Sequence, residues 1–258
     1  MILGKSMSFL RGVFSSFLFY LNITLWMTFS LTTLILPRRY FMSILKNWAL
    51  FSMKLCRWSA GLDYRITGLE HLPKGGFLVA AKHQSAWETF ALIPLFDDPA
   101  FILKRELMWF PLFGWLAAKA KMIPIHRGAR SKALKMMTAK AREALANGRQ
   151  IVIFPEGTRK APDALPDYKW GIAHLYRELD VPVVPIALNS GYFWPRSSVR
   201  RFPGIIDMRI LPAIQPGLAA KDFLSQLEAS IEGNMPAPCY APQLSSETKQ
   251  SAKALAEE

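Results

Sequence analysis

An uncharged run of 26 residues near the N-terminus constrains the fold of this chain more than any other feature of its sequence. The run extends from Gly12 to Pro37, between Arg11 and Arg38, and reads GVFSSFLFYLNITLWMTFSLTTLILP. About 20 consecutive apolar residues are enough for a helix to cross the hydrocarbon core of a bilayer. No small-residue cleavage pattern precedes Arg38, so we expect the segment to be retained rather than removed as a signal peptide.

Hydroxyl and amide side chains dilute this run, so a helix that lies in the membrane interface competes with a spanning helix. Residues 40–58 favour a second helix, because Lys46, Lys54 and Arg57 share one face at 100° per residue. The opposite face is apolar, which is typical of a helix in the lipid headgroup layer. A helix packed on a domain with a solvated basic edge is the alternative. We assign residues 1–62 to an N-terminal membrane-associating segment.

The charge of the chain favours a membrane partner over nucleic acid. Lys and Arg total 32 against 19 Asp and Glu, a formal net charge of +13. The basic residues of the first 62 positions lie beside the longest apolar runs, and no acidic residue precedes Asp63. Interleaved basic and apolar residues suit an anionic lipid surface. We therefore predict membrane lipids as a partner and no nucleic acid. If the first helix spans, the basic residues after it place the remaining chain in the cytoplasm.

Residues 63–233 predict a single α/β domain. Short apolar runs alternate with helical stretches, which indicates an open, mostly parallel sheet flanked by helices. The expected strands are 76–81, 100–104, 121–125, 150–154, 181–188 and 205–211. The expected helices are 85–95, 111–119, 131–147, 169–179 and 219–232. Residues 234–258 turn polar and proline-rich, and we expect them to form a tail.

Cysteine spacing and the absence of common motifs exclude several classes of protein. Cys56 and Cys239 lie far apart, with no CxxC pair and no histidine cluster, so neither a disulfide framework nor a zinc site is indicated. The sequence contains no GxSxG, GxGxxG or GxxxxGK[ST] pattern. Serine hydrolases, dinucleotide-binding proteins and P-loop proteins in their usual forms are therefore excluded.

His83 follows the predicted strand at residues 76–81, at the carboxyl end, where ligands bind in open parallel sheets. Glu88 comes five residues later, which is 140° away on an ideal helix, so the two side chains meet only if His83 stands on the loop before the helix. A carboxylate at one ring nitrogen would then orient the imidazole to accept a proton at the other. A pair of surface or helix-capping residues is the alternative that these two positions leave open.

Basic and turn residues at three other strand ends indicate a bound anion. Lys104 ends one predicted strand, Arg127 follows the next, and the turn PEGTR follows a third. In that turn Gly157 would let backbone amides approach a ligand, Thr158 supplies a hydroxyl, and Arg159 offers a planar fork suited to phosphate. Solvated ion pairs and an ordinary β-turn are the alternatives.

The blocks HQSAWE (83–88), KRELMWFPLFGW (104–115) and FPEGTR (154–159) together resemble the glycerolipid acyltransferase family, specifically its bacterial 1-acylglycerol-3-phosphate acyltransferases. The resemblance extends from about Gly68 to Gly191. It implies the α/β fold of that family and the transfer of a fatty acyl group from acyl-CoA or acyl-carrier protein. The acceptor would be the sn-2 hydroxyl of lysophosphatidic acid and the product phosphatidic acid. The resemblance implies no cofactor and no metal, and a place at the cytoplasmic face of the bacterial inner membrane.

The resemblance also implies roles for individual residues. His83 matches the base that deprotonates the acceptor hydroxyl, and Glu88 matches the acid that orients this base. The positions linked with binding the glycerol phosphate are matched by Lys104, Arg127, Glu156, Gly157 and Arg159, and the hydroxyl of Thr158 adds to them. The motif around His83 differs from the family's usual pattern at two positions. Lys82 occupies a position where Asn is common, and Glu88 occupies one where Asp is common.

Two other interpretations stay open. The same chemistry could act on another lysolipid, such as a lyso-ornithine lipid. A non-catalytic basic membrane-binding protein with the same fold is a rival of a different class. That rival predicts no measurable effect of replacing His83, whereas an enzyme would lose at least about 10²-fold in rate.

Overall fold

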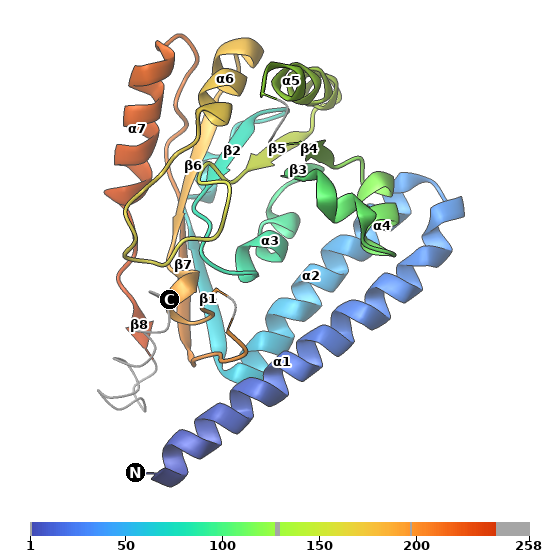
Figure 1. The fold of residues 1–258 in the computed structure, drawn as a ribbon, viewed down its shortest axis with the longest axis vertical. Coiled ribbons are helices and arrows are strands. Elements are labelled where there is room, and N and C mark those ends of the chain that lie inside the picture. Colours follow the sequence, from blue (N-terminus) through green and yellow to red (C-terminus); the bar gives the residue numbers. More distant parts are fainter. Residues whose placement is uncertain (1, 127–129, 197, 241–258) are drawn as a thin grey trace.

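One sheet organises the chain, and most of its described strands pair in parallel (Figure 1). The computed structural model describes residues 2–126, 130–196 and 198–240. In spatial order the strands are β1 (Leu62–Thr67), β7 (Gly204–Ile210), β6 (Val183–Leu188), β2 (Leu78–Ala81), β5 (Gln150–Ile153), β3 (Pro99–Lys104) and β4 (Ile123–Ile125). Only β6 and β7 pair antiparallel along this described path. The expected open, mostly parallel sheet is confirmed.

Seven α-helices within the described residues surround the sheet. They are α1 (Ile2–Ser30), α2 (Arg38–Ala60), α3 (Trp87–Ala91), α4 (Phe113–Lys119), α5 (Arg130–Ala146), α6 (Trp170–Leu179) and α7 (Ala220–Glu232). Short 3₁₀ helices include η1 (Leu31–Ile35), η3 (Ile93–Leu95), η4 (Arg105–Trp109) and η5 (Ser190–Tyr192). The two-residue β8 (Cys239–Tyr240) pairs antiparallel with β7, and the end of the predicted tail, residues 241–258, lies outside the described residues.

Side chains that alternate along the central strands build a core on each face of the sheet. In β2, Val79 and Ala81 belong to one buried cluster, whereas Leu78 and Ala80 belong to the other. Successive residues of a strand point to opposite faces, so a strand that is buried on both sides reads as a continuous apolar run. Helices α1, α2 and α3 supply the first cluster, and α5, α6 and α7 supply the second.

Two local differences from the predicted elements have simple causes. β1 was not among the expected strands. It is an edge strand, and in its sequence LDYRIT only Leu62 is fully buried, so it lacks the apolar run that marks the other strands. The helix expected at residues 85–95 is shorter, since α3 ends at Ala91 and a 3₁₀ turn follows. Pro94 lies in that turn and lacks the amide hydrogen that a continuing α-helix would need.

The two N-terminal helices form an antiparallel hairpin that packs along the domain (Figure 1). Helix α2 buries Ala49, Met53 and Cys56 in the same cluster as the sheet, and α1 adds Phe19. The stretch Leu10–Ile35 is long and apolar enough to cross a membrane, judged by length and composition alone. Because the hairpin shares the domain core, its position is fixed relative to the sheet.

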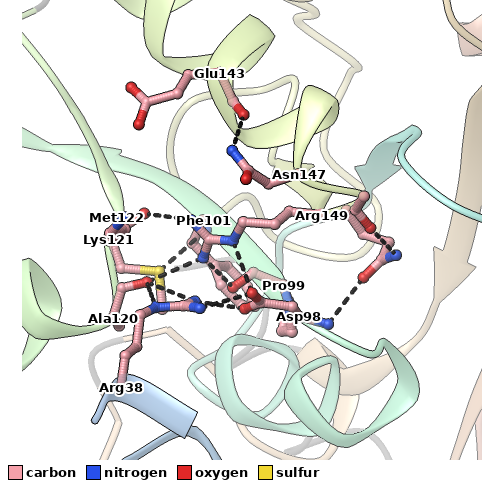
Figure 2. A network of polar contacts seen from close by, with 12 residues as sticks. Arg38, Asp98, Pro99, Phe101, Ala120, Lys121, Met122, Glu143, Asn147 and Arg149 are labelled. Atoms are coloured by element: carbon pink, nitrogen blue, oxygen red, sulfur yellow. Dashed lines mark hydrogen bonds and ion pairs between the residues drawn. The ribbon is translucent and has the colours of Figure 1, made fainter.

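Arg38, the first residue of α2, joins the turn of the hairpin to Asp98, the residue directly before β3. Its guanidinium group donates two hydrogen bonds to Asp98, at 2.7 and 2.5 Å, and another to the carbonyl of Ala120 at 3.0 Å (Figure 2). Arg149 approaches the same carboxylate at 3.2 Å and the same carbonyl at 3.0 Å. Burial would raise the pKa of Asp98, but the two guanidinium groups outweigh it and hold that pKa below its ordinary value. We call these four residues the hairpin latch.

Candidate active site

The carboxyl ends of β2, β5, β3 and β4 meet at one edge of the sheet, because these strands are parallel neighbours. His83 lies two residues after β2, and the turn that contains Glu156 and Gly157 follows β5. Lys104 is the last residue of β3. Arg127 follows β4 in the sequence and lies outside the described residues. The strand ends thus bring the expected blocks together, as ligand sites in such sheets require.

The imidazole of His83 is hydrogen-bonded to the carboxylate of Glu88. The distance from His83 Nδ1 to Glu88 Oε1 is 2.9 Å. His83 stands on the loop before α3, and Glu88 lies in the first turn of that helix, which is how a five-residue spacing can close. The same oxygen accepts the backbone amides of Gln84 and Ser85, at 2.6 and 2.7 Å. Glu88 therefore orders the loop and contacts the imidazole, and the catalytic role of this pair stays a prediction.

Glu88 is fully buried, and five donors keep it ionised. Its second oxygen accepts the hydroxyls of Ser85 at 2.8 Å and Ser190 at 2.7 Å. Burial alone would raise the pKa of Glu88, but the contacts with His83, the Ser85 amide and the Ser190 hydroxyl outweigh it and lower that pKa. An ionised carboxylate only accepts hydrogen bonds, so His83 carries its proton on Nδ1 and leaves Nε2 as the basic nitrogen.

Phe154 holds the plane of the His83 ring from one side. The two rings stack with centroids 4.0 Å apart and an interplanar angle of 16°. Phe154 is the residue directly after β5, so the stack joins two strand ends. Sequence reasoning missed Phe154 and Ser190 as site residues. The only sequence signal was their position: Phe154 directly follows the buried strand β5, and Ser190 lies two residues after the buried strand β6.

A cleft of about 590 Å³ opens beside His83. Lys104, Glu156, Gly157 and Thr158 are among its lining residues, so four of the six expected phosphate-binding residues border it. Arg159 follows Thr158 but does not line the cleft in this structure, and its carbonyl accepts a hydrogen bond from Arg196 at 3.0 Å. Gly157 has φ +69°, a left-handed conformation that favours glycine in this turn. Lys169 also lines the cleft and was not expected from the sequence.

The carboxylate of Glu156 faces inward rather than toward the opening. Its side chain is fully buried, with Oε1 2.9 Å from Lys82 Nζ and Oε2 3.4 Å from the backbone nitrogen of His83. A carboxylate would also repel a phosphate. This placement differs from the phosphate contact expected for Glu156, which stays a prediction for the backbone of that residue only.

An apolar cavity of about 240 Å³ adjoins the cleft. It lies between the helical hairpin, α3, α4 and β3, and it shares Thr89 and Leu103 with the lining of the cleft. Other lining residues include Trp26 and Met27 of α1 and Phe41 and Leu45 of α2. A cleft that carries the charged residues Lys104 and Lys169 therefore meets an apolar cavity near His83.

No cluster of three or more His, Cys, Asp or Glu side chains that could hold a metal ion occurs within the described ranges. The reaction without metal or cofactor stays a prediction. Both cysteines are free thiols, Cys56 buried and Cys239 exposed.

Comparison with known proteins places the chain among acyltransferases. Residues 63–189 match the family model described as Acyltransferase. The 1-acyl-sn-glycerol-3-phosphate acyltransferase of Pseudomonas aeruginosa is 39% identical over 181 residues, which cover 70% of each chain. The mouse 1-acyl-sn-glycerol-3-phosphate acyltransferase alpha is 28% identical over 179 residues, covering 68% of this chain and 63% of the mouse protein.

The crystal structure of the 1-acyl-sn-glycerophosphate acyltransferase from Thermotoga maritima superposes with a TM-score of 0.74. The match covers 88% of this chain and 95% of the other, at 23% sequence identity, and it establishes the shared fold. In sequence, the chain is more similar to the Pseudomonas protein than to the Thermotoga protein. The chain therefore belongs to the acyltransferase family.

Proposed function

We propose that this protein transfers a fatty acyl group from acyl-CoA or acyl-carrier protein to the sn-2 hydroxyl of lysophosphatidic acid, giving phosphatidic acid. One observation carries the proposal: the His83–Glu88 pair stands where a cleft that contains Lys104 adjoins an apolar cavity. A phosphate-bearing lipid and a fatty acyl chain need those two environments next to one base. The named activities of the Pseudomonas and mouse relatives agree with this substrate.

In the proposed reaction His83 Nε2 accepts the proton of the acceptor hydroxyl while that oxygen attacks the thioester carbonyl. The new C–O ester bond forms, the C–S bond breaks, and the proton on Nε2 passes to the leaving thiolate. Glu88 stabilises the imidazolium through Nδ1, where the contact is 2.9 Å. General base catalysis of this kind contributes about 10²- to 10⁴-fold to a rate.

The acceptor phosphate would lie at the strand ends that border the cleft. Lys104 supplies an ammonium group, and the turn at Gly157 and Thr158 supplies backbone amides and a hydroxyl. Arg127 and Arg159 stay in the proposal as additional cations that the bound lipid would engage. The fatty acyl chain would lie in the apolar cavity, where its burial lowers the free energy by about 0.8 kcal/mol per methylene.

The manner of membrane association is inferred from how the apolar stretch of α1 is held. Midway along α1, Ser16 donates to the carbonyl of Val199 at 2.7 Å, and Arg201 donates to the carbonyl of Ser15 at 2.6 Å. Beyond its far end, Arg38 belongs to the hairpin latch. A spanning α1 would therefore draw the sheet into the hydrocarbon. We propose instead that the hairpin lies in one leaflet.

Exposed apolar side chains mark the face that would enter the bilayer. On α1 and η1 they include Phe14, Phe17, Tyr20, Leu25, Phe29 and Ile35; on η4, α4 and the turn between them they are Leu107, Trp109, Phe110, Phe113 and Trp115. Lys119 connects the two groups, since it donates to the carbonyls of Leu34 and Leu36 at 2.8 and 2.5 Å. Tryptophan favours the level of the lipid headgroups. Water-soluble acyl thioesters and two free thiols favour the cytoplasmic face of the bacterial inner membrane.

The proposal is tested with purified protein in detergent, labelled acyl-CoA or acyl-carrier protein, and a panel of lysolipids offered one at a time. We expect turnover of lysophosphatidic acid to exceed that of lyso-ornithine lipid and of lysophospholipids with larger headgroups. A His83→Ala sample is the control for contaminating activity. Turnover of lyso-ornithine lipid without turnover of lysophosphatidic acid would replace the acceptor and leave the acyl transfer intact.

A further inference from the structure

A buried lysine lies directly behind the base. The side chain of Lys82 has no exposed surface, and its ammonium group lies between two carboxylates. Nζ is 2.9 Å from Glu156 Oε1 and 2.8 Å from Glu232 Oε1. Glu232 is the last residue of α7, 150 positions later in the chain, and Glu156 belongs to the turn after β5. The acyl-transfer chemistry described above makes no use of this lysine.

The contacts around Lys82 pair its amine with two carboxylates and hold it in one place. Burying an ammonium group is costly unless the charge is paired and its hydrogen bonds are made. Two carboxylates meet that condition, and Tyr168 adds a third contact by donating to Glu232 Oε1 at 2.8 Å. Burial, together with the charge of Glu232, raises the pKa of Tyr168, so its phenol remains a donor. Lys82 Nζ also lies 5.8 Å from the centre of the Tyr168 ring.

The same network reaches the backbone of His83 from both sides. Glu156 Oε2 accepts the amide of His83 at 3.4 Å, and the carbonyl of His83 accepts the amide of Lys160 at 2.8 Å. Glu88 at Nδ1 and the stacked Phe154 hold the ring. Glu156 holds the backbone that carries this ring, so the position of Nε2 depends on both sets of contacts. Lys82 is the only cation that contacts Glu156 within the part of the chain described by the structure.

We propose that Lys82 is a positioning residue: anchored by Glu232 at the end of α7, it holds Glu156 against the His83 amide and so aims the base into the cleft. The role rests on the proposed function, because it is exerted through His83. It accounts for the contact between the loop after β2 and the end of α7.

The charges around Glu156 give the proposal a signature in the pH dependence of the rate. Burial raises the pKa of Glu156, Lys82 and the His83 amide oppose that rise, and Glu232 adds to it. The other titratable groups facing this cluster are Tyr168 and, from α7, Glu228. Removal of the Lys82 charge should raise the pKa of Glu156, whereas removal of the Glu232 charge should lower it. Without the Lys82 charge, Glu156 becomes ionised and active only at higher pH. Without the Glu232 charge, it becomes ionised and active at lower pH.

The experiment compares Lys82→Met, Lys82→Arg, Glu232→Gln and Asp222→Asn in the full-length protein, with melting temperature recorded for each. Asp222 is the matched control, because it is an exposed carboxylate in the first turn of α7 and no described hydrogen bond joins it to Lys82. For Lys82→Met we expect kcat to fall about tenfold, with the KM for lysophosphatidic acid within about twofold and the acidic limb of the pH profile moved to higher pH. Lys82→Arg should keep the limb in place.

For Glu232→Gln we expect kcat to fall about threefold and the acidic limb to move to lower pH, while Asp222→Asn behaves like the wild type. Opposite movements of the limb are the decisive result, since a loss of stability alone does not produce them. A folded Lys82→Met protein with wild-type kcat and an unmoved limb overturns the proposal. If Lys82→Met does not fold, a Glu232→Gln protein that matches Asp222→Asn in kcat and pH profile overturns it. Wild-type turnover of lysophosphatidic acid in the same assay tests the proposed function separately, because the inference is judged only on the ratio of variant to wild type.

Discussion

Ser190 lies 102 positions after Glu88 in the chain, yet its hydroxyl donates a hydrogen bond of 2.7 Å to Glu88 Oε2. Ser190 begins η5, directly after Asn189 at the end of β6, and Glu88 belongs to the first turn of α3. The contact thus joins the strand ends of β6 and β2 beneath the His83 ring. It is one of the donors that keep the buried carboxylate ionised.

Replacing Ser190 with alanine is expected to lower kcat about tenfold, because a hydrogen bond to a buried charged group is worth about 1.5 to 3 kcal/mol. Loss of the donor raises the pKa of Glu88, so the acidic limb of the kcat profile should move to higher pH. Steady-state rates from pH 5 to 8 would be compared with those of Ser225→Ala, an exposed serine of α7. An unmoved limb and unchanged kcat would remove Ser190 from the site.

The same carboxylate makes folding depend on pH. The pKa of Glu88 is lowered in the folded protein, so its stabilising contribution is present above the ordinary glutamate pKa of about 4.3 and is lost as pH falls through the folded value. Ser190→Ala should therefore lower the free energy of unfolding at pH 7 and have progressively less effect below about pH 4. Urea titrations at several pH values measure this difference.

Glu88 itself separates orientation from simple packing. Glu88→Gln keeps the size of the side chain but removes the charge that stabilises the imidazolium, and we expect kcat to fall by at least about 10²-fold with KM within about twofold. Glu88→Asp keeps the charge on a shorter side chain, so partial activity should remain. Equal activity of the Gln and Asp variants would show that the ionised carboxylate does not act through His83.

Much of this site was predictable from the sequence, because motifs at the ends of parallel strands converge whatever the strand order. The positions of His83, Lys104 and Gly157 after buried strands were enough to bring them to one edge. Glu88 was ambiguous, since its distance from His83 depends on where the helix begins. Only the structure shows that α3 starts after the loop, at Trp87.

Contacts between residues distant in the chain were beyond sequence reasoning. Ser190, Phe154 and Glu232 reach the site through the pairing order of β6, β2 and β5 and through the end of α7, and a local pattern contains no information on either. The antiparallel pairing of β7 with β6 was not predicted for the same reason. The edge strand β1 was not predicted because only Leu62 in it is fully buried. The packing of the hairpin on the domain likewise depends on Arg38 meeting Asp98, 60 positions away.

The hairpin latch gives a prediction for stability. Arg38→Met leaves Asp98 with one guanidinium partner instead of two, and we expect the free energy of unfolding to fall by about 1 to 3 kcal/mol at pH 7. The pKa of Asp98 is lowered in the folded protein, so the difference should shrink below about pH 4, as Asp98 becomes protonated. Arg39→Met is the matched control, because Arg39 is exposed and contacts its neighbour Tyr40. Equal destabilisation by both substitutions would argue against the latch.

The exposed aromatic residues of η4 and α4 give a prediction for membrane binding. Trp109→Ala combined with Trp115→Ala should weaken the binding of the protein to anionic vesicles by at least about tenfold, since each indole can bury apolar surface in the lipid. Sedimentation with vesicles of stated anionic content measures the change. Met136→Ala, on the exposed side of α5 across the sheet, should have no effect. Wild-type binding by the double variant would confine the lipid contact to the hairpin.

The most direct measurement of the central claim is kcat/KM of His83→Ala with lysophosphatidic acid and a labelled acyl thioester, combined with vesicle binding of the same sample. The account predicts a loss of at least about 10²-fold in kcat/KM with vesicle binding and melting temperature unchanged. Turnover equal to that of the wild type, in a folded and membrane-bound His83→Ala protein, would contradict the assignment of His83 as the base.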